Sequence, residues 1–308
     1  MPSPDRCVCS TKMNLKMKNK TGILPRLCLT ALLAAWVCCA AHCQVPETEV
    51  KRPVTSSFML EAGASSILDT YLSPIKNTGA HVRLEYERLQ AMRFNPENWL
   101  MQLDTGVDYD NVTNPVGNHT EHSLMADFRW GMMRRWQNVY TQGLQLALGG
   151  MAQFRGGVIY KPSNSNNLVS AKIHFAVGLS GMASYGVKLL GVPVTLRYQA
   201  TLPVAGVFFS PEYEESYYEI YVGNHSGLAH FGWWANRFDM TNLLTADLHL
   251  GSTVLRLGYR NRIETSWINH LNTQIFTHAA VIGVGGEWLS LRKGTQISGK
   301  SKIISAMY

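Results

Sequence analysis

Hydrophobic and polar residues alternate with a period of two along most of the chain after residue 57. The stretch EHSLMADFRWGMMRRW (121–136) shows the pattern, because Leu124, Phe128 and Trp130 share one parity and Asp127 and Arg129 the other. A period of two places successive side chains on opposite faces of a β-strand. Ordinary strands have about 5–6 residues, and this stretch is much longer. We therefore expect strands with one apolar face and one charged face, long enough to cross a membrane.

Ten segments share this pattern and together predict an all-β fold. They are residues 58–65, 82–87, 99–108, 121–136, 144–155, 169–180, 192–199, 244–250, 255–262 and 276–288. Single-chain bacterial barrels have an even number of antiparallel strands. A soluble antiparallel sandwich would alternate as well, but its strands would be shorter. The pattern favours a transmembrane antiparallel up-and-down β-barrel of about ten strands over residues 56–292.

The connections between these segments alternate in length, as they do in a barrel with both termini in the periplasm. The short connections lie at 95–98, 137–138, 186–191 and 251–252, and the longer ones at 66–78, 110–118, 161–167, 208–240 and 267–272. Pro193 and Pro203 interrupt the seventh segment. Because proline donates no ladder hydrogen bond, we expect a bulge there.

Residues 1–43 have the composition of a signal peptide. Six basic residues accompany the apolar run LCLTALLAAWVCCAA, and AHC before Gln44 is the expected cleavage site. All six cysteines fall within these 43 residues, so the remaining chain holds no disulfide. Translation starting at Met13 or Met17 would make the first residues a misassigned N-terminal extension. Residues 44–55 are then a periplasmic N-terminal segment.

The basic charge of the chain lies largely in this leader. Six of the 28 lysine and arginine residues and one of the 21 acidic residues precede Gln44, which leaves a net charge of +2 afterwards. Nucleic acid is therefore not an expected partner. No run of about 18 apolar residues follows the leader, so a spanning helix is not expected either.

At this point the chain resembles the Gram-negative outer-membrane β-barrel proteins and, more loosely, an uncharacterised family of them known as a domain of unknown function. The resemblance is carried by AHCQ at the cleavage site, DTYLSP after the first strand, LRLGYRNRIETS in the ninth and the terminal aromatic Tyr308. It implies export by the cleaved signal peptide, residence in the bacterial outer membrane among its lipids, and insertion by the barrel assembly machinery. Residues 293–308 depart from the pattern and read as a polar C-terminal tail, or as a further strand ending in Tyr308.

Charged residues occupy the inward parity of the predicted strands. Opposite charges in a narrow lumen should pair, and open aqueous channels appear only at about 16–18 strands. We therefore expect a lumen filled with ion pairs, and a narrow solute channel is the alternative. The predicted lumen charges are Glu85, Asp104, Asp127, Arg129, Lys172, Arg197, Arg256, Arg260 and Arg262.

Aromatic residues are dense in segment 208–240, the longest predicted outer connection. Exposed aromatic side chains stack on ligands, anchor at lipid headgroups or cover a barrel mouth. A glycan or lipid ligand is the corresponding prediction, and an envelope binding or barrier role follows from it. SYYEIYV and LAHFGWW could instead form two further strands, which would give a barrel of twelve. The candidate ligand-binding residues are Tyr217, Tyr218, Tyr221, Trp233 and Trp234.

Catalysis is left open by the sequence. His225 and Ser226 in NHSG could serve a hydrolase of phospholipid or lipid A, because an imidazole can activate a hydroxyl. On a strand these adjacent residues would point to opposite faces, so the hydrolase requires a loop. The histidines are dispersed and no ligand spacing recurs, so neither a metal nor another cofactor is expected.

Overall fold

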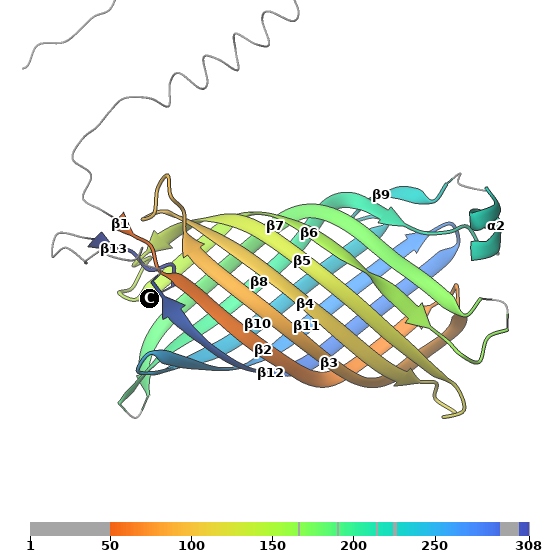
Figure 1. Cartoon of the computed structure of the whole chain (residues 1–308), viewed down its shortest axis with the longest axis horizontal. Helices are drawn as coiled ribbons and strands as arrows, with labels where there is room; N and C mark the ends of the chain where they lie inside the picture. Colours follow the sequence, from red (N-terminus) through yellow and green to blue (C-terminus); the bar gives the residue numbers. More distant parts are fainter. Residues whose placement is uncertain are drawn as a thin grey trace, which may run out of the picture. The chain divides into compact units, whose positions relative to one another are not determined.

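The computed structural model describes residues 50–165, 167–189, 191–213, 215–223, 227–289 and 302–307. Ten long antiparallel strands form its wall (Figure 1). They are β2 (Val54–Asp69), β3 (Ser73–Ala91), β4 (Trp99–Thr113), β5 (Thr120–Gln137), β6 (Leu144–Tyr160), β7 (Val169–Leu189), β8 (Val192–Phe209), β10 (Arg237–Leu250), β11 (Thr253–Ile268) and β12 (Leu271–Trp288). Each contains one of the ten segments predicted from the sequence.

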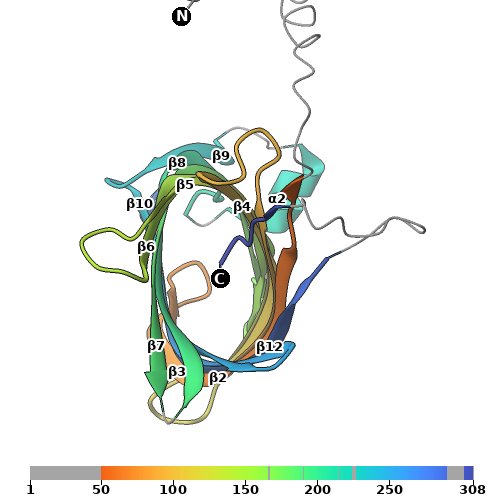
Figure 2. The same cartoon turned by 90° about the vertical axis from the view of Figure 1, so that its left-hand side faces the viewer.

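The wall closes on itself. Neighbours in sequence pair throughout, β12 pairs with β2, and β8 pairs with β10 from Thr201–Thr241 to Val194–Leu248. The view along the strands shows the resulting ring (Figure 2). The prediction of a ten-stranded up-and-down barrel is confirmed. Closure pairs the edges that an open sheet would leave bare, which a lipid environment requires.

The twelve-stranded alternative is wrong. SYYEIYV contributes the short helix α2 (Tyr217–Val222), not a strand. LAHFGWW contains β9 (Ala229–Trp233), which pairs with β8 beyond the point where β8 leaves β10. Ser216 and Glu219 form a capping box that holds the start of the helix. This local hydrogen bonding favours a helical turn over the extended backbone that the alternating side chains suggested.

The two ends of the barrel differ. We call the end that carries β1 (Val50–Lys51) and β13 (Lys302–Ile303) the terminal end, and the end that carries α2 the loop end. β1 and β13 pair in parallel, apart from the wall. Residues 302–307 thus form neither a free polar tail nor an eleventh wall strand. The structure does not describe residues 1–49, so the predicted signal peptide and its cleavage site remain predictions.

Two of the predicted long outer connections are tight turns. β2 and β3 continue to a turn at 70–72, and β11 and β12 meet at Asn269 and His270 with φ of 52° and 63°. Ser66 toward the end of β2, and Asn77 and Thr78 toward the start of β3, look like loop residues but keep the ladder pairing. The small polar side chains of these residues are why the sequence pattern predicted a loop where the two strands continue. The bulge expected at Pro203 is confirmed, because the β7–β8 register shifts at Val177–Gly178.

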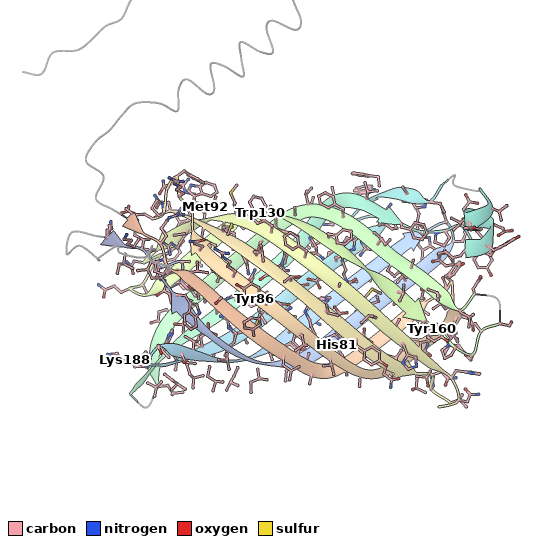
Figure 3. The ribbon with its side chains drawn as sticks, viewed as in Figure 1. His81, Tyr86, Met92, Trp130, Tyr160 and Lys188 are labelled. Atoms are coloured by element: carbon pink, nitrogen blue, oxygen red, sulfur yellow. The ribbon has the colours of Figure 1, made fainter. Side chains whose placement is uncertain are left out.

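Outward side chains form an apolar belt around the wall. Phe58, Leu84 and Phe128 are exposed on this face, and Trp267 and Trp288 lie near strand ends. Figure 3 shows side chains standing off the wall, with Tyr86 and Trp130 labelled. An apolar band bounded by aromatic residues is the lipid-facing surface of a transmembrane barrel. No described helix is long and apolar enough to cross a membrane.

Leu84 is an outward residue of β3 and is 64% exposed, with apolar neighbours in the belt. Leu84→Lys places a charge in the hydrocarbon, so we expect the free energy of unfolding in phospholipid vesicles to fall by about 2–4 kcal/mol. Urea titration followed by tryptophan fluorescence measures it. Tyr140→Lys, in an exposed turn, is the matched control and should change little. Equal stability of Leu84→Lys and the parent would contradict the lipid-facing assignment.

Candidate functional site

The interior of the barrel is filled by three successive layers of side chains. Alternation along each strand places every second residue inside, and the residue type changes from one end to the other. Along β3 the inward residues run from His81 through Arg83, Glu85 and Glu87 to Leu89. Charged residues thus occupy the middle, and apolar clusters lie toward both ends.

Arg83 is the centre of the middle layer. Its guanidinium lies 2.7 Å from Glu85, 2.9 Å from Asp108 and 2.5 Å from Asp127, and its side chain is fully buried. Arg155 forms two hydrogen bonds to Asp108, at 2.8 and 2.9 Å. Two parallel N–H···O bonds join the planar guanidinium to the two carboxylate oxygens, and this bidentate arrangement makes the pair strong and directional.

The ion pairs extend on both sides of Arg83. Arg260 bonds Glu85 at 2.8 Å, and Arg262 approaches Asp108 and Asp127 at 3.4 and 3.8 Å. Toward the terminal end, Glu87 accepts hydrogen bonds from Arg197 at 2.9 Å and Arg256 at 2.5 Å. The remaining predicted lumen charges pair as Arg129 with Asp104 at 2.8 Å and Lys172 with Asp69 at 2.9 Å.

All nine predicted lumen charges therefore point inward and have a partner of opposite charge. The list of nine leaves out other equally central residues, namely Arg83, Glu87, Asp108, Arg155 and Asp247. The same alternation in the sequence places these residues on the inward face as well. Removing one partner of such a buried pair leaves an uncompensated charge, which costs about 3–5 kcal/mol.

An apolar cluster closes the loop end. Ile67, Val112, Met125, Ile159 and Ile275 point inward from five strands. Tyr71 and Leu72 of the β2–β3 turn pack on them, and Leu271 joins from the start of β12. This group, which we call the loop-end cap, separates the charged layer from the outer surface.

Tyr217 joins α2 to the loop-end cap. Its ring lies edge-on to the ring of Tyr71, with 5.6 Å between the ring centroids, and stacks on Phe209, with 6.4 Å between the centroids. Its hydroxyl accepts a hydrogen bond from the backbone N–H of Ala171 at 2.6 Å. Tyr71 donates to the carbonyl of Glu215 at 2.9 Å. Burial raises the pKa of Tyr71 and of Tyr217, so both phenols keep their protons at a higher pH than an exposed tyrosine does.

Residues 305–307 close the barrel at its terminal end. Ala306 and Met307 are buried against Leu89, Leu100 and Met133, and the C-terminal end lies inside the ring of strands (Figure 2). We call this group the terminal-end cap.

Arg135 fixes the backbone of the terminal-end cap. It donates to the carbonyls of Ser305 at 2.7 Å and Ala306 at 2.9 Å, and to those of Pro96 and Glu97 in the β3–β4 turn. Lys302 also pairs with the Glu97 carboxylate. The tail that looked polar in sequence thus contains three consecutive residues, Ser305–Met307, that are held by hydrogen bonds and apolar packing.

The five predicted aromatic ligand-binding residues do not share one environment. Tyr217 belongs to the loop-end cap, whereas Tyr218 and Tyr221 on α2 are 74% and 86% exposed. Trp233 of β9 pairs with Ala205 of β8 and is exposed. Trp234 follows β9, and its indole N–H donates to the Pro203 carbonyl at 2.8 Å. His225 and Ser226 lie outside the described residues, so the lipid hydrolase stays a prediction.

The wall is interrupted where β9 ends. Ala205 of β8 pairs with Trp233, and Thr201 of β8 pairs with Thr241. These two pairs are four residues apart along β8 but eight residues apart along the chain that faces it. Arg237 lies within this break and points inward, 2.9 Å from Asp239 and 3.2 Å from the Nδ1 atom of His174. Arg237 and His174 line two small cavities of about 30 and 10 Å³, and Asp239 lines the smaller one. The larger has room for about two water molecules.

The described residues contain no group of three or more His, Cys, Asp or Glu side chains arranged to hold a metal ion.

The closed wall, its even number of strands and its apolar outer face define a β-barrel of the bacterial outer membrane type. Within this class the chain belongs to the family described as "Protein of unknown function (DUF3316)", which matches residues 26–294. The resemblance to an uncharacterised outer-membrane barrel family is therefore confirmed.

Several solved structures are similar to the chain. The transport unit of the autotransporter AIDA-I from Escherichia coli is 7% identical and aligns over 84% of this chain and 97% of its own, with a TM-score of 0.35. The translocator domain of the autotransporter NalP from Neisseria meningitidis is 9% identical over 85% and 98%, with a TM-score of 0.34. An outer-membrane channel from Pseudomonas putida is 9% identical over 80% and 100%, with a TM-score of 0.30. The comparison with curated proteins found no match.

The raised pKa of Tyr71 makes the loop-end cap sensitive to alkali. An unfolded tyrosine titrates near pH 10, so the buried phenol stabilises the folded state fully below about pH 10 and loses this contribution as the pH rises further. We expect the free energy of unfolding to fall more steeply above pH 10 in the parent than in Tyr71→Phe. Urea titrations from pH 8 to 11.5 measure both slopes.

Tyr71→Phe also loses the hydrogen bond to Glu215, so its stability below pH 10 should be about 1 kcal/mol lower. Tyr140→Phe, at a tyrosine that is 96% exposed, is the matched control and should follow the parent curve. Identical slopes for Tyr71→Phe and the parent would show that Tyr71 does not titrate with the cap.

Proposed function

We propose that this protein is a sealed outer-membrane barrel that serves the cell envelope by binding and as part of the permeability barrier, without conducting solutes. The observation that carries this proposal is the continuous filling of the lumen by the loop-end cap, the ion pairs around Arg83 and the terminal-end cap. A ten-stranded ring is narrow, and its inward side chains meet across it. Arg197 of β8, for example, reaches Glu87 of β3.

The charges of the lumen argue against the alternative of a narrow channel. Ions cross a pore by binding weakly to sites that they can leave. Here Arg83, Arg155 and Arg256 are each held by two or more carboxylates at short distance, so a passing ion would have to break buried pairs. The larger of the two cavities at the wall break, of about 30 Å³, accommodates water but not a hydrated solute.

The binding part of the proposal rests on α2. Tyr217 anchors the helix in the loop-end cap, and the capping box of Ser216 and Glu219 fixes its start. Tyr218 and Tyr221 are therefore presented to the outside from a held support, which lowers the entropic cost of binding. Two exposed phenol rings suit the apolar faces and hydroxyl groups of a saccharide. We therefore propose a glycan of the cell surface as the ligand.

Planar-bilayer recording tests the sealed lumen. The refolded parent protein should give no conductance steps under conditions in which a general porin conducts, because no water-filled path crosses the three layers. Circular dichroism and the gel shift on heating establish that the barrel is folded. Steps from the folded parent, with a size that changes in Arg262→Gln, would replace the sealed barrel by a charge-lined channel.

Binding of lipopolysaccharide-derived polysaccharide tests the role of α2. We expect Tyr218→Ser combined with Tyr221→Ser to weaken binding at least tenfold in isothermal titration calorimetry, since two stacking contacts are lost. Tyr140→Ser removes an equally exposed tyrosine at the terminal end and should bind as the parent does. Unchanged affinity in the double variant would place any glycan site elsewhere.

A further inference from the structure

A row of polar side chains crosses the outer face of four neighbouring strands. Tyr198 of β8 donates to Asn242 of β10 at 2.8 Å, and Asn242 lies 3.5 Å from Asn261 of β11. Asn261 in turn lies 3.4 Å from His278 of β12, whose ring also contacts the hydroxyl of Tyr259. We call these five residues the outer polar row.

The outer polar row lies within the apolar belt and not at its rim. On β11 the outward residues Leu257 and Ile263 flank Tyr259 and Asn261, and Trp267 lies further toward the loop end. On β12, Phe276 precedes His278 and Ile282 follows it on the same face. On β10, Asn242 stands between outward Met240 and Leu244. Apolar side chains thus continue on both sides of the row along every strand.

Amides and an imidazole are costly at this depth. Hydrocarbon offers no hydrogen-bond partner, so polar groups there must be satisfied by protein. Each asparagine side chain has two N–H donors and a carbonyl with two lone pairs. Asn261 donates to the Thr277 carbonyl at 3.3 Å as well as contacting His278, so its spare capacity lies in its carbonyl oxygen, whereas Asn242 also keeps a second N–H.

Small side chains surround the row. His278 pairs with Ala64 of β2, Tyr259 pairs with Ala280, and Asn242 pairs with Ala200. Ala62 lies one outward position from Ala64. Elsewhere on the outer face, large residues such as Phe58, Phe154 and Phe175 stand out from the wall. Small residues beside polar ones let a second transmembrane wall approach closely enough for hydrogen bonds to form across the contact.

We propose that the outer polar row is the centre of an interface with a second copy of this chain. Asn242, Asn261 and His278 can each donate and accept hydrogen bonds. The row is therefore complementary to a second copy of itself related by a twofold axis. None of the five side chains is a cation of fixed charge that would attract a lipid phosphate. Headgroups also lie outside the hydrocarbon, whereas another barrel reaches this depth. Because this surface is separate from the lumen and from α2, the dimer stands or falls independently of the proposed function.

Cysteine cross-linking in membranes tests the interface. No cysteine occurs after Cys43, so Asn261→Cys introduces one thiol at the centre of the row. We expect oxidation of outer-membrane preparations to give a disulfide-linked dimer that the unsubstituted chain does not form. Ala126→Cys is the matched control, since Ala126 points outward from β5 on the far side of the ring and should not cross-link. Equal cross-linking at both positions, or none at Asn261→Cys, would overturn the proposal.

Native mass spectrometry from mild detergent gives a second measurement. The parent should be dimeric, and replacement of Asn242, Asn261 and His278 by leucine should lower the dimer fraction at least tenfold. The gel shift on heating shows whether the variant folds, which we expect because leucine suits a lipid-facing position. A monomeric parent, or a folded triple-leucine variant that dimerises as the parent does, would show that the row is no interface.

Discussion

Every other feature of this protein depends on the closure of its hydrogen-bonded wall. In hydrocarbon, an unpaired backbone amide or carbonyl has nothing to bond, so a sheet that spans the membrane must join its own edges. The pairing of β8 with β10 provides this closure. Once the ring is closed, alternation along the strands sends each side chain either to lipid or to the lumen. The number of strands then sets how much room the lumen has.

A narrow ring with a polar inner face has to satisfy its charges internally. Arg83 and the carboxylates around it achieve this in the middle of the barrel, where their side chains are buried. Buried ion pairs gain little stability compared with apolar packing. Their value here is geometric, because bidentate pairs such as Arg155–Asp108 link strands that are not neighbours in the wall. The apolar caps at both ends separate these pairs from bulk solvent, which strengthens the electrostatic attraction between the opposite charges.

The alternation in the sequence predicted the strands and the direction of their side chains. It did not predict the strand ends or the helix α2, which depend on local hydrogen bonding. Each of the ten strands was predicted, and so was the inward direction of charged residues such as Arg260, because the period of two fixes the face. The ends of β2 and β3 were missed, since Ser66 and Thr78 look like loop residues although they pair across the ladder. The same limit applied to Tyr217, where a capping box turned an alternating stretch into a helix.

The alternation of hydrophobic and polar residues could not predict contacts between residues far apart in the sequence. Nothing in the residues around Ser305 shows that Arg135 would bind their carbonyls, because arginine with backbone oxygen leaves no periodic signal. The outer polar row was missed for a related reason. Asn242, Asn261 and His278 stand on three different strands, and each of them alone looks like an ordinary exception to an apolar face. Only the register between strands brings them together.

The position of Met307 inside the ring also dictates an order of events during biogenesis. The side chains that surround it come from β3, β4, β5, β6 and β7, so its pocket exists only when the middle of the wall has assembled. Residues 305–307 can therefore reach their final place only after these five strands have paired. A bulky group attached within residues 305–307 would therefore compete with this closing step, while leaving the wall strands free to pair.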